Sequence, residues 1–245
     1  MKAFSIIILL ALISCHPSKE ERQSLSFSKK EFVTEPCSAE PCAKVNIAWE
    51  EAFGTEVGTN INKAVFSHLL AYFRQDTVFA DLATAAKDFV TSYNRFKQDF
   101  PDSPGGWTIE IDSEKTYESD SLVSIKFTEF NFTGGAHPNS SVNFLNFDKT
   151  SGELLTEEEL ILDQEKFLEL AEKAFREFHQ VEEGVALKDD GRFFLPDTGF
   201  FIPNAFGYEG DKLKLIYIPY EIGPYSLGYT ELEFDLDELE EIVKK

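Results

Sequence analysis

Residues 121–159 constrain the fold of this chain more tightly than any other segment. Side chains alternate in character over Leu122–Phe132, which predicts a strand with one row of side chains on each side of a sheet. The Thr-Gly-Gly-Ala-His run that ends at His137 predicts a tight loop, and Val142–Phe147 is expected to pair back on the first strand. A Thr-Glu-Glu-Glu run that starts at Thr156 has the spacing of a helix-capping box. We therefore expect a hairpin or bulged meander followed directly by a helix.

The alternation assigns the side chains of the first strand to two faces. One face carries Leu122, Ser124, Lys126, Thr128 and Phe130, and the other carries Val123, Ile125, Phe127, Glu129 and Asn131.

The remaining helices and strands come in separate blocks along the chain. Apolar residues at helical spacing predict helices over Ile61–Arg74 (capped by Thr59 or Asn60), Val78–Phe100 (capped by Asp76 or Thr77) and from Thr156 to about Gln180. Strands are expected over Leu25–Thr34, Cys42–Trp49, Trp107–Asp112, Leu213–Ile218 and Tyr229–Leu236, with an extended Arg192–Ile202 and a short closing helix over Asp237–Lys245. Such blocks indicate an α+β fold, an antiparallel sheet with packed helices, and argue against a doubly wound parallel sheet.

The N-terminus predicts a secreted and lipid-anchored protein. A basic start is followed by the apolar run Ala3–Ile13, which is too short to span a bilayer but suits the core of a signal peptide. The run ends in Leu-Ile-Ser-Cys15, which resembles the lipobox of bacterial lipoproteins. We expect a signal peptide over 1–14, a lipidated Cys15 and a flexible tether over 15–24 that anchors the protein in the cell envelope, at the outer membrane or the cell surface. An ordinary secretory signal with a chance cysteine is the alternative.

The charge of the chain excludes some partners. It carries 44 acidic and 23 basic residues, for a formal net charge of −21. Such a surface repels nucleic acid and offers no polybasic contact to a membrane, so the lipid anchor is the expected membrane contact. The charge favours a cationic partner, or serves solubility alone.

The remaining cysteines, Cys37 and Cys42, are spaced C-x4-C beside two prolines. Outside the cytoplasm an even pair predicts a disulfide. A redox pair would usually be C-x-x-C at a helix start, and a zinc site would need two more ligands nearby. Neither condition is met, so a structural disulfide is favoured.

Three motifs carry a resemblance to a known family. They are Phe130-Asn-Phe-Thr-Gly-Gly-Ala-His137, Asn146-Phe-Asp-Lys-Thr-Ser-Gly-Glu-Leu-Leu-Thr156 and Tyr217-Ile-Pro-Tyr-Glu-Ile-Gly-Pro-Tyr-Ser-Leu-Gly228. In order and spacing they resemble the paired envelope domains of the lysozyme-sensing anti-sigma factor ectodomain, a module that also precedes the catalytic domain of a peptidoglycan deacetylase. The resemblance covers roughly Ala43 to Val243.

The resemblance implies one α+β module with an N-terminal part over 25–120 and a C-terminal part over 121–245. It also implies an envelope location and an association with lysozyme or the cell wall. The metal ligands of the deacetylase belong to a separate domain that follows the module, so neither a metal nor a cofactor is expected here.

The first candidate ligand-contact loop holds Gly134, Gly135 and His137. Its glycines can adopt positive φ and expose N–H groups to an anion or a carbonyl group. Alternatively the glycines only satisfy the turn, and His137 hydrogen-bonds the backbone. No second His or Cys lies at short ligand spacing, which argues against a metal site. His68 and His179 fall on predicted helices and are expected at the surface or at the edge of the core.

The second candidate loop holds Tyr220, Glu221 and Tyr225. Two aromatic rings beside one carboxylate, on a loop stiffened by Pro and Gly, suit a protein or glycan partner. The alternative is a loop that closes the core with both tyrosines half-buried.

No catalytic constellation is recognisable, because G-x-S-x-G and H-E-x-x-H are both missing from the sequence. The leading hypothesis is a non-enzymatic, lipid-anchored envelope protein that binds a cationic protein such as a lysozyme-like muramidase, or peptidoglycan. The alternative is a peptidoglycan-modifying enzyme or accessory subunit that uses His137 and a nearby carboxylate.

Overall fold

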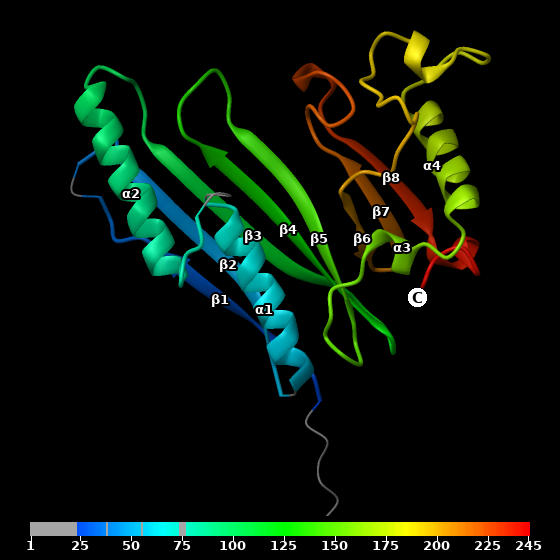
Figure 1. Cartoon of the computed structure of the whole chain (residues 1–245), viewed down its shortest axis with the longest axis horizontal. Coiled ribbons are helices and arrows are strands. Elements are labelled where there is room, and N and C mark those ends of the chain that lie inside the picture. Colours follow the sequence, from blue (N-terminus) through cyan, green and yellow to red (C-terminus); the bar gives the residue numbers. More distant parts are fainter. Residues whose placement is uncertain (1–23, 38, 55, 74–76) are drawn as a thin grey trace, which may run out of the picture.

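The structure is a computed structural model that describes residues 24–37, 39–54, 56–73 and 77–245. It has two lobes, a five-stranded sheet covered by two helices and a smaller three-stranded sheet covered by one long helix (Figure 1). The expected signal peptide, the lipidated Cys15, nearly all of the tether and the possible helix cap Asp76 lie outside the described residues.

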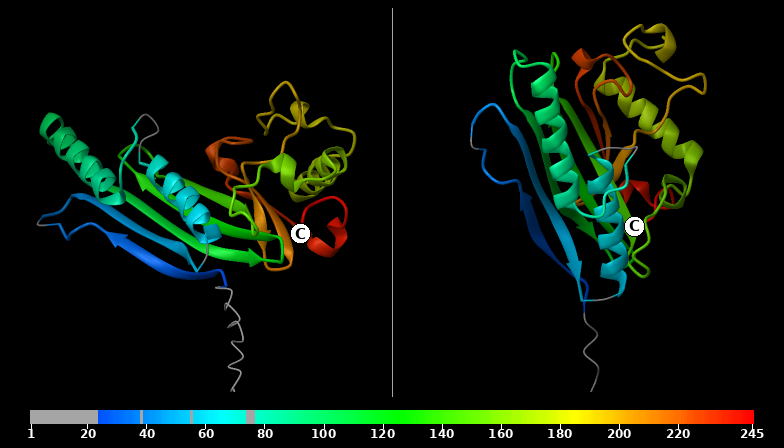
Figure 2. Two further views of the ribbon diagram at one scale, coloured as in Figure 1. Left: turned by 60° about the horizontal axis from the view of Figure 1, so that its bottom comes forward. Right: turned by 60° about the vertical axis from the view of Figure 1, so that its left-hand side comes forward.

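The first sheet has the strand order β1-β2-β3-β4-β5. Its strands are β1 (Ser26–Val33), β2 (Ala43–Phe53), β3 (Trp107–Glu118), β4 (Leu122–Phe132) and β5 (Asn139–Asp148). All neighbours are antiparallel except β2 and β3, which run parallel. The parallel pair arises because α1 (Glu56–Ala71) and α2 (Leu82–Asp99) carry the chain back across one face of the sheet before β3 begins (Figure 2). The predicted α+β class is confirmed, with this one parallel pair added.

The two predicted faces of β4 are confirmed by burial. Val123, Ile125 and Phe127 are fully buried against α1 and α2 in the core of the first lobe. Leu122, from the other face, belongs to the core of the second lobe. Full burial of each such side chain contributes about 1.5–3 kcal/mol. The strand therefore ties the two cores together.

The second lobe is built from β6 (Ala205–Glu209), β7 (Lys212–Tyr217) and β8 (Thr230–Asp235) in that spatial order. Helix α4 (Gln164–Phe178) packs on this sheet, after a short α3 (Glu157–Leu160). Phe175 of α4 meets the ring of Tyr217 at a centroid distance of 5.4 Å. Tyr217 is fully buried, and its hydroxyl donates to the carbonyl oxygen of Phe201 at 2.6 Å. The 24 phenylalanines of the chain favour such an aromatic core.

The two lobes meet along β5 and β6. Phe144 and Ile216 lie in a small buried cluster between the sheets. Next to it, the Ser124 hydroxyl donates to Oδ1 of Asn146 at 2.7 Å, and Nδ2 of Asn146 donates to the Phe206 carbonyl at 2.9 Å. These buried polar groups therefore satisfy one another across the junction, which holds the lobes in one arrangement.

The expected starts of the first two helices are wrong. Helix α1 begins earlier than predicted, so Thr59 and Asn60 lie inside it. Helix α2 begins later than predicted, and Asp81 caps it by accepting a hydrogen bond from the Thr84 amide at 2.7 Å. Thr77 is therefore not its cap. Helical spacing of apolar residues marks the buried stripe of a helix but not its first turn, which depends on the capping side chain.

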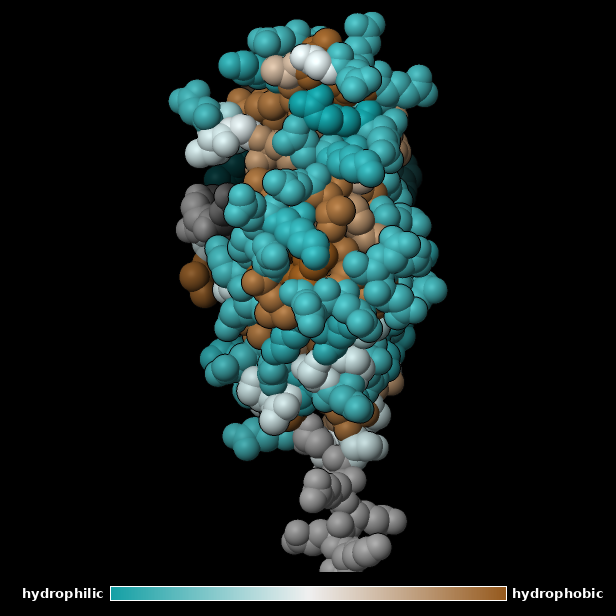
Figure 3. All heavy atoms as spheres, turned by 90° about the vertical axis from the view of Figure 1, so that its right-hand side faces the viewer, coloured by the Kyte–Doolittle hydropathy of each residue, from teal (hydrophilic) through white to brown (hydrophobic). Residues whose placement is uncertain are grey.

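The helix predicted from Thr156 is interrupted. The capping box is present, but α3 ends after one turn because Ile161 forms a β-bridge with Val243. Asp163 then caps α4 by accepting from the Lys166 amide at 3.1 Å. Phe178, the last residue of α4, is 50% exposed. Hydrophobic patches also interrupt the mainly hydrophilic surface on the side of the molecule that Figure 3 faces.

Three further expectations differ from the structure. Residues 192–202 are irregular rather than extended, and the closing helix is a 3₁₀ turn over Leu236–Leu239. The division at residues 120/121 falls in the turn between β3 and β4, inside one sheet, whereas the chain changes lobe only after β5. Among the described residues, no helix combines the length and the hydropathy that crossing a membrane requires.

Candidate functional site

The loop between β4 and β5 presents His137 at one end of the first sheet. Gly134 and Gly135 have φ of +97° and +113°, a region that L side chains rarely adopt, and a Cβ on either would meet nothing within 4 Å. The backbone conformation, rather than a lack of space, therefore requires glycine at both positions. The turn leaves His137 exposed.

The loop after β7 brings two tyrosines to the same place. The rings of His137 and Tyr225 are stacked, with centroids 4.0 Å apart and planes 17° apart. Nε2 of His137 lies 3.1 Å from the hydroxyl oxygen of Tyr220, and Nδ1 lies 3.2 Å from the Pro138 carbonyl oxygen. We call His137, Tyr220 and Tyr225 the aromatic cluster. Two loops that the sequence singled out separately thus form one site that joins the lobes.

The aromatic cluster is open to solvent. Tyr220 is 57% exposed and Tyr225 is 40% exposed. Tyr220 also has a φ of +73°, which is unusual for a bulky residue and costs on the order of 1–3 kcal/mol. An exposed aromatic ring on a strained backbone position, as at Tyr220, suits contact with a partner better than it suits the protein's own packing.

Glu221 has a different role from the one expected. Its Oε1 accepts hydrogen bonds from the backbone N and the side-chain Nδ2 of Asn204, both at 2.9 Å. Its Oε2 accepts from the Ile218 amide at 3.0 Å. Both oxygens therefore hold the loop that carries the tyrosines, so Glu221 positions the aromatic cluster.

Cys37 and Cys42 form the expected disulfide, in the loop that leads into β2. With Glu40 they make up the group of three potential metal ligands found among the described residues. Because the two sulfur atoms are bonded to each other, neither offers a thiolate, and the site does not fit a metal.

His68 and Glu129 form a pair that the sequence did not reveal. Glu129 is only 2% exposed and lies on the face of β4 that packs against α1, where Nε2 of His68 sits 2.5 Å from its Oε1. His68 was expected at the surface or core edge, and it is half-buried. The sequence contains one sign of this pair: Glu129 follows the apolar residues Val123, Ile125 and Phe127 in the same row. A carboxylate buried in such a row requires a partner.

His179 lies at the edge of the second core, as expected. Its Nε2 is 2.8 Å from Oγ1 of the fully buried Thr230. Burial, and next the positive charge of Arg192, lower the pKa of His179. The imidazole is therefore favoured in its neutral form.

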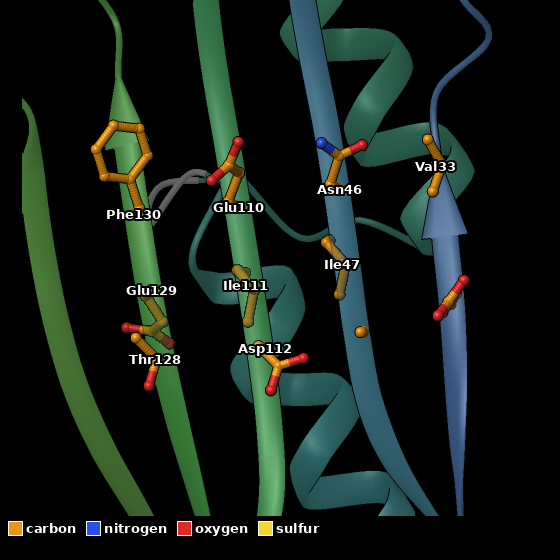
Figure 4. Close-up of a pocket in the computed structure, with 11 residues that line it drawn as sticks. Val33, Asn46, Ile47, Glu110, Ile111, Asp112, Thr128, Glu129 and Phe130 are labelled. Atoms are coloured by element: carbon orange, nitrogen blue, oxygen red, sulfur yellow. The ribbon is translucent and has the colours of Figure 1, made fainter.

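The face of the first sheet that no helix covers has a shallow groove of about 410 Å³ (Figure 4). Asn46, Glu110, Asp112 and Thr128 lie on it and are exposed. Asp112 pairs with Nζ of Lys29 at 2.9 Å. We assign no reactive role to this exposed face.

Comparison with known proteins identifies the kind of domain. Residues 36–140 match the family model described as Deacetylase PdaC. The fold is similar to that of a DUF3298 family protein from Pseudomonas aeruginosa PAO1, with a TM-score of 0.62 and 25% identity over 91% of this chain and 94% of that one. It is also similar to a DUF3298 family member from Bacteroides fragilis NCTC 9343, with a TM-score of 0.67 and 18% identity over 91% and 95% of the two chains. No curated protein matches the sequence. The chain therefore contains a DUF3298/PdaC-like domain.

Proposed function

We propose that this DUF3298/PdaC-like chain is a non-enzymatic binding protein of the bacterial cell envelope, anchored by lipid on Cys15. Its partner is a cationic protein such as a lysozyme-like muramidase. The resemblance of three motifs to the lysozyme-sensing anti-sigma factor ectodomain supports the partner class, and the lipobox-like Leu-Ile-Ser-Cys run supports the anchor.

The aromatic cluster is the observation that carries the proposal. His137 comes from the first lobe, Tyr220 and Tyr225 come from the second, and all three are exposed. Tyrosine is among the residues that contribute most to binding at protein interfaces. Its ring also attracts Lys and Arg side chains, by about 0.5–1 kcal/mol at an exposed site.

The net charge of −21 adds a long-range attraction for a cationic partner. Complementary charge mainly raises the association rate, and the attraction weakens with salt because the Debye length is about 10 Å at 0.1 M ionic strength. The proposal therefore combines a short-range aromatic contact with salt-sensitive steering.

The enzyme alternative requires a carboxylate beside His137. The hydrogen-bonding partners described for His137 are the Tyr220 hydroxyl and the Pro138 carbonyl, and its ring neighbours are tyrosines. Glu221, the acidic residue of the neighbouring loop, has both oxygens occupied. The geometry around His137 therefore favours contact over proton transfer.

Isothermal titration of the purified protein with a lysozyme tests the proposal at low and at moderate salt. We expect a saturable complex whose association rate, followed separately by stopped-flow, falls as salt rises. Purified sacculi serve as a second probe in a pull-down. Binding to sacculi without binding to lysozyme would replace the proposed partner with the cell wall, and an absence of heat at both salt concentrations would remove the proposal.

A further inference from the structure

A second site lies between α1 and β5, away from the aromatic cluster. It is a groove of about 620 Å³. Lys63 and His68 of α1 lie on one wall, Leu145 of β5 belongs to the lining, and Glu153 and Leu154 come from the turn after β5. A volume of this size is typical of small-molecule sites.

His68 is fixed in this groove by a buried carboxylate. Besides His68 Nε2, Glu129 accepts hydrogen bonds from the Ser141 hydroxyl at 2.6 Å and from Nδ2 of Asn143 at 2.8 Å. Three polar side chains therefore converge on one buried carboxylate.

This arrangement selects one tautomer of His68. An ionised carboxylate can only accept hydrogen bonds, so with Glu129 in this form Nε2 of His68 is the donor. In the neutral ring the lone pair is then on Nδ1. No described residue hydrogen-bonds Nδ1, and the side chain of His68 is 22% exposed at the groove. His68 thus offers an oriented acceptor to whatever enters.

Opposite charges flank this acceptor. Within the described residues, Lys63 and Glu153 line the groove and neither forms an ion pair there. Leu145 and Leu154 add apolar surface, and Leu154 is 49% exposed. A free ammonium group, a free carboxylate and an apolar wall in one groove complement a ligand that carries both charges and an apolar side chain.

We infer that the groove between α1 and β5 binds a zwitterionic ligand, an amino acid or a short peptide. The ligand's ammonium group donates to the Glu153 carboxylate and to Nδ1 of His68, and its carboxylate accepts from Nζ of Lys63. Its apolar side chain packs on Leu145 and Leu154. Glu129 does not touch the ligand and is a positioning residue for His68.

Titration of the protein with the dipeptide leucyl-leucine tests the inference, with binding followed by calorimetry and by NMR of the ¹⁵N-labelled side chain of His68. We expect saturable binding and a His68 spectrum with the lone pair on Nδ1. N-acetyl-leucyl-leucine lacks the ammonium group and leucyl-leucinamide lacks the carboxylate. Each should bind at least about 10-fold more weakly, because a hydrogen bond to a charged group is lost.

Variants locate the site. Lys63→Gln and Glu153→Gln should each weaken leucyl-leucine binding by about 10-fold or more, whereas Lys87→Gln, an exposed lysine of α2, should leave it unchanged. Glu129→Gln should weaken binding and give a mixture of His68 tautomers. If Glu129→Gln does not fold, the two exposed groove variants still decide the question.

Three results would overturn the inference. The first is no saturation by leucyl-leucine at millimolar concentration. The second is equal binding of the blocked dipeptides. The third is a His68 lone pair on Nε2. Lysozyme binding by these groove variants should remain at the level of the unmodified protein, so failure here is distinguishable from failure of the proposed function.

Discussion

Replacing Gly207 with alanine should separate the two lobes locally. Gly207 lies on β6 against Phe144 of β5, and an added methyl group would overlap Cγ of the ring and lie 2.5 Å from Cβ of Phe144. Phe144 is 7% exposed and packs in the junction between the sheets. Rotating the ring cannot relieve an overlap with Cβ, so the strands must move apart.

The expected cost follows from overpacking. Extra methyl groups in a packed core cost about 1–3 kcal/mol. The upper end applies here because side-chain rotation cannot absorb the clash, so we expect a loss of about 3 kcal/mol and a fall in Tm of about 6–12 °C. Gly210→Ala is the matched control on the same hairpin. A Cβ atom added at Gly210 would meet nothing within 4 Å. Alanine at the φ of +59° found there should cost only about 1–2 kcal/mol.

A double-mutant cycle with Phe144→Ala isolates the contact. Removal of the ring alone should cost about 3–5 kcal/mol. In the Gly207→Ala background it should cost about 2–3 kcal/mol less, because the clash disappears with the ring. Urea unfolding measures all four free energies. Additive effects, or a Gly207→Ala protein as stable as the Gly210→Ala control, would refute the packing described at the junction.

Three further outcomes are expected. Tyr217→Phe leaves the Phe201 carbonyl without its donor, and the free energy of unfolding in urea should fall by about 1–2 kcal/mol; no change would mean that water replaces the hydroxyl. Because the folded pKa of His179 is lowered, its contribution to stability is complete above about pH 6.5 and is lost as pH falls toward the folded pKa. His179→Gln should therefore flatten the decline in urea midpoint on acidification, and an unchanged pH dependence would contradict this. The Cys37–Cys42 disulfide closes only a short loop. The free energy of unfolding, measured thermally with and without reductant, should therefore differ by only about 2 kcal/mol.

Much of the fold was predictable because it depends on local patterns. The alternation over Leu122–Phe132 assigned both faces of β4 correctly, and the capping box at Thr156 is present. The parallel pairing of β2 and β3 was missed because strand direction is set by where two intervening helices pack, which the pattern within each strand does not record. The break after α3 was missed for a similar reason, since Ile161 leaves the helix to pair with Val243 from the end of the sequence.

The candidate site was predictable in part. Gly–Gly and Gly–Pro pairs marked both loops, and the rings of His137 and Tyr225 from these loops stack on each other. That the loops meet could not be read from the sequence, because 88 positions separate the two residues. The bonds by which Glu221 holds its loop could not be predicted either, because its partner Asn204 belongs to a segment with no regular pattern. The pairing of His68 with Glu129 likewise depends on the contact between α1 and β4.

Binding of a lysozyme by the variant Tyr220→Ala/Tyr225→Ala tests the central claim most directly. The matched control is Phe53→Ala, which removes an aromatic ring 39% exposed at the opposite end of the first sheet. If the protein works by contact through the aromatic cluster, isothermal titration should show binding at least about 30-fold weaker for the tyrosine variant and unchanged for the control. Equal affinities for both variants and the unmodified protein would contradict that account.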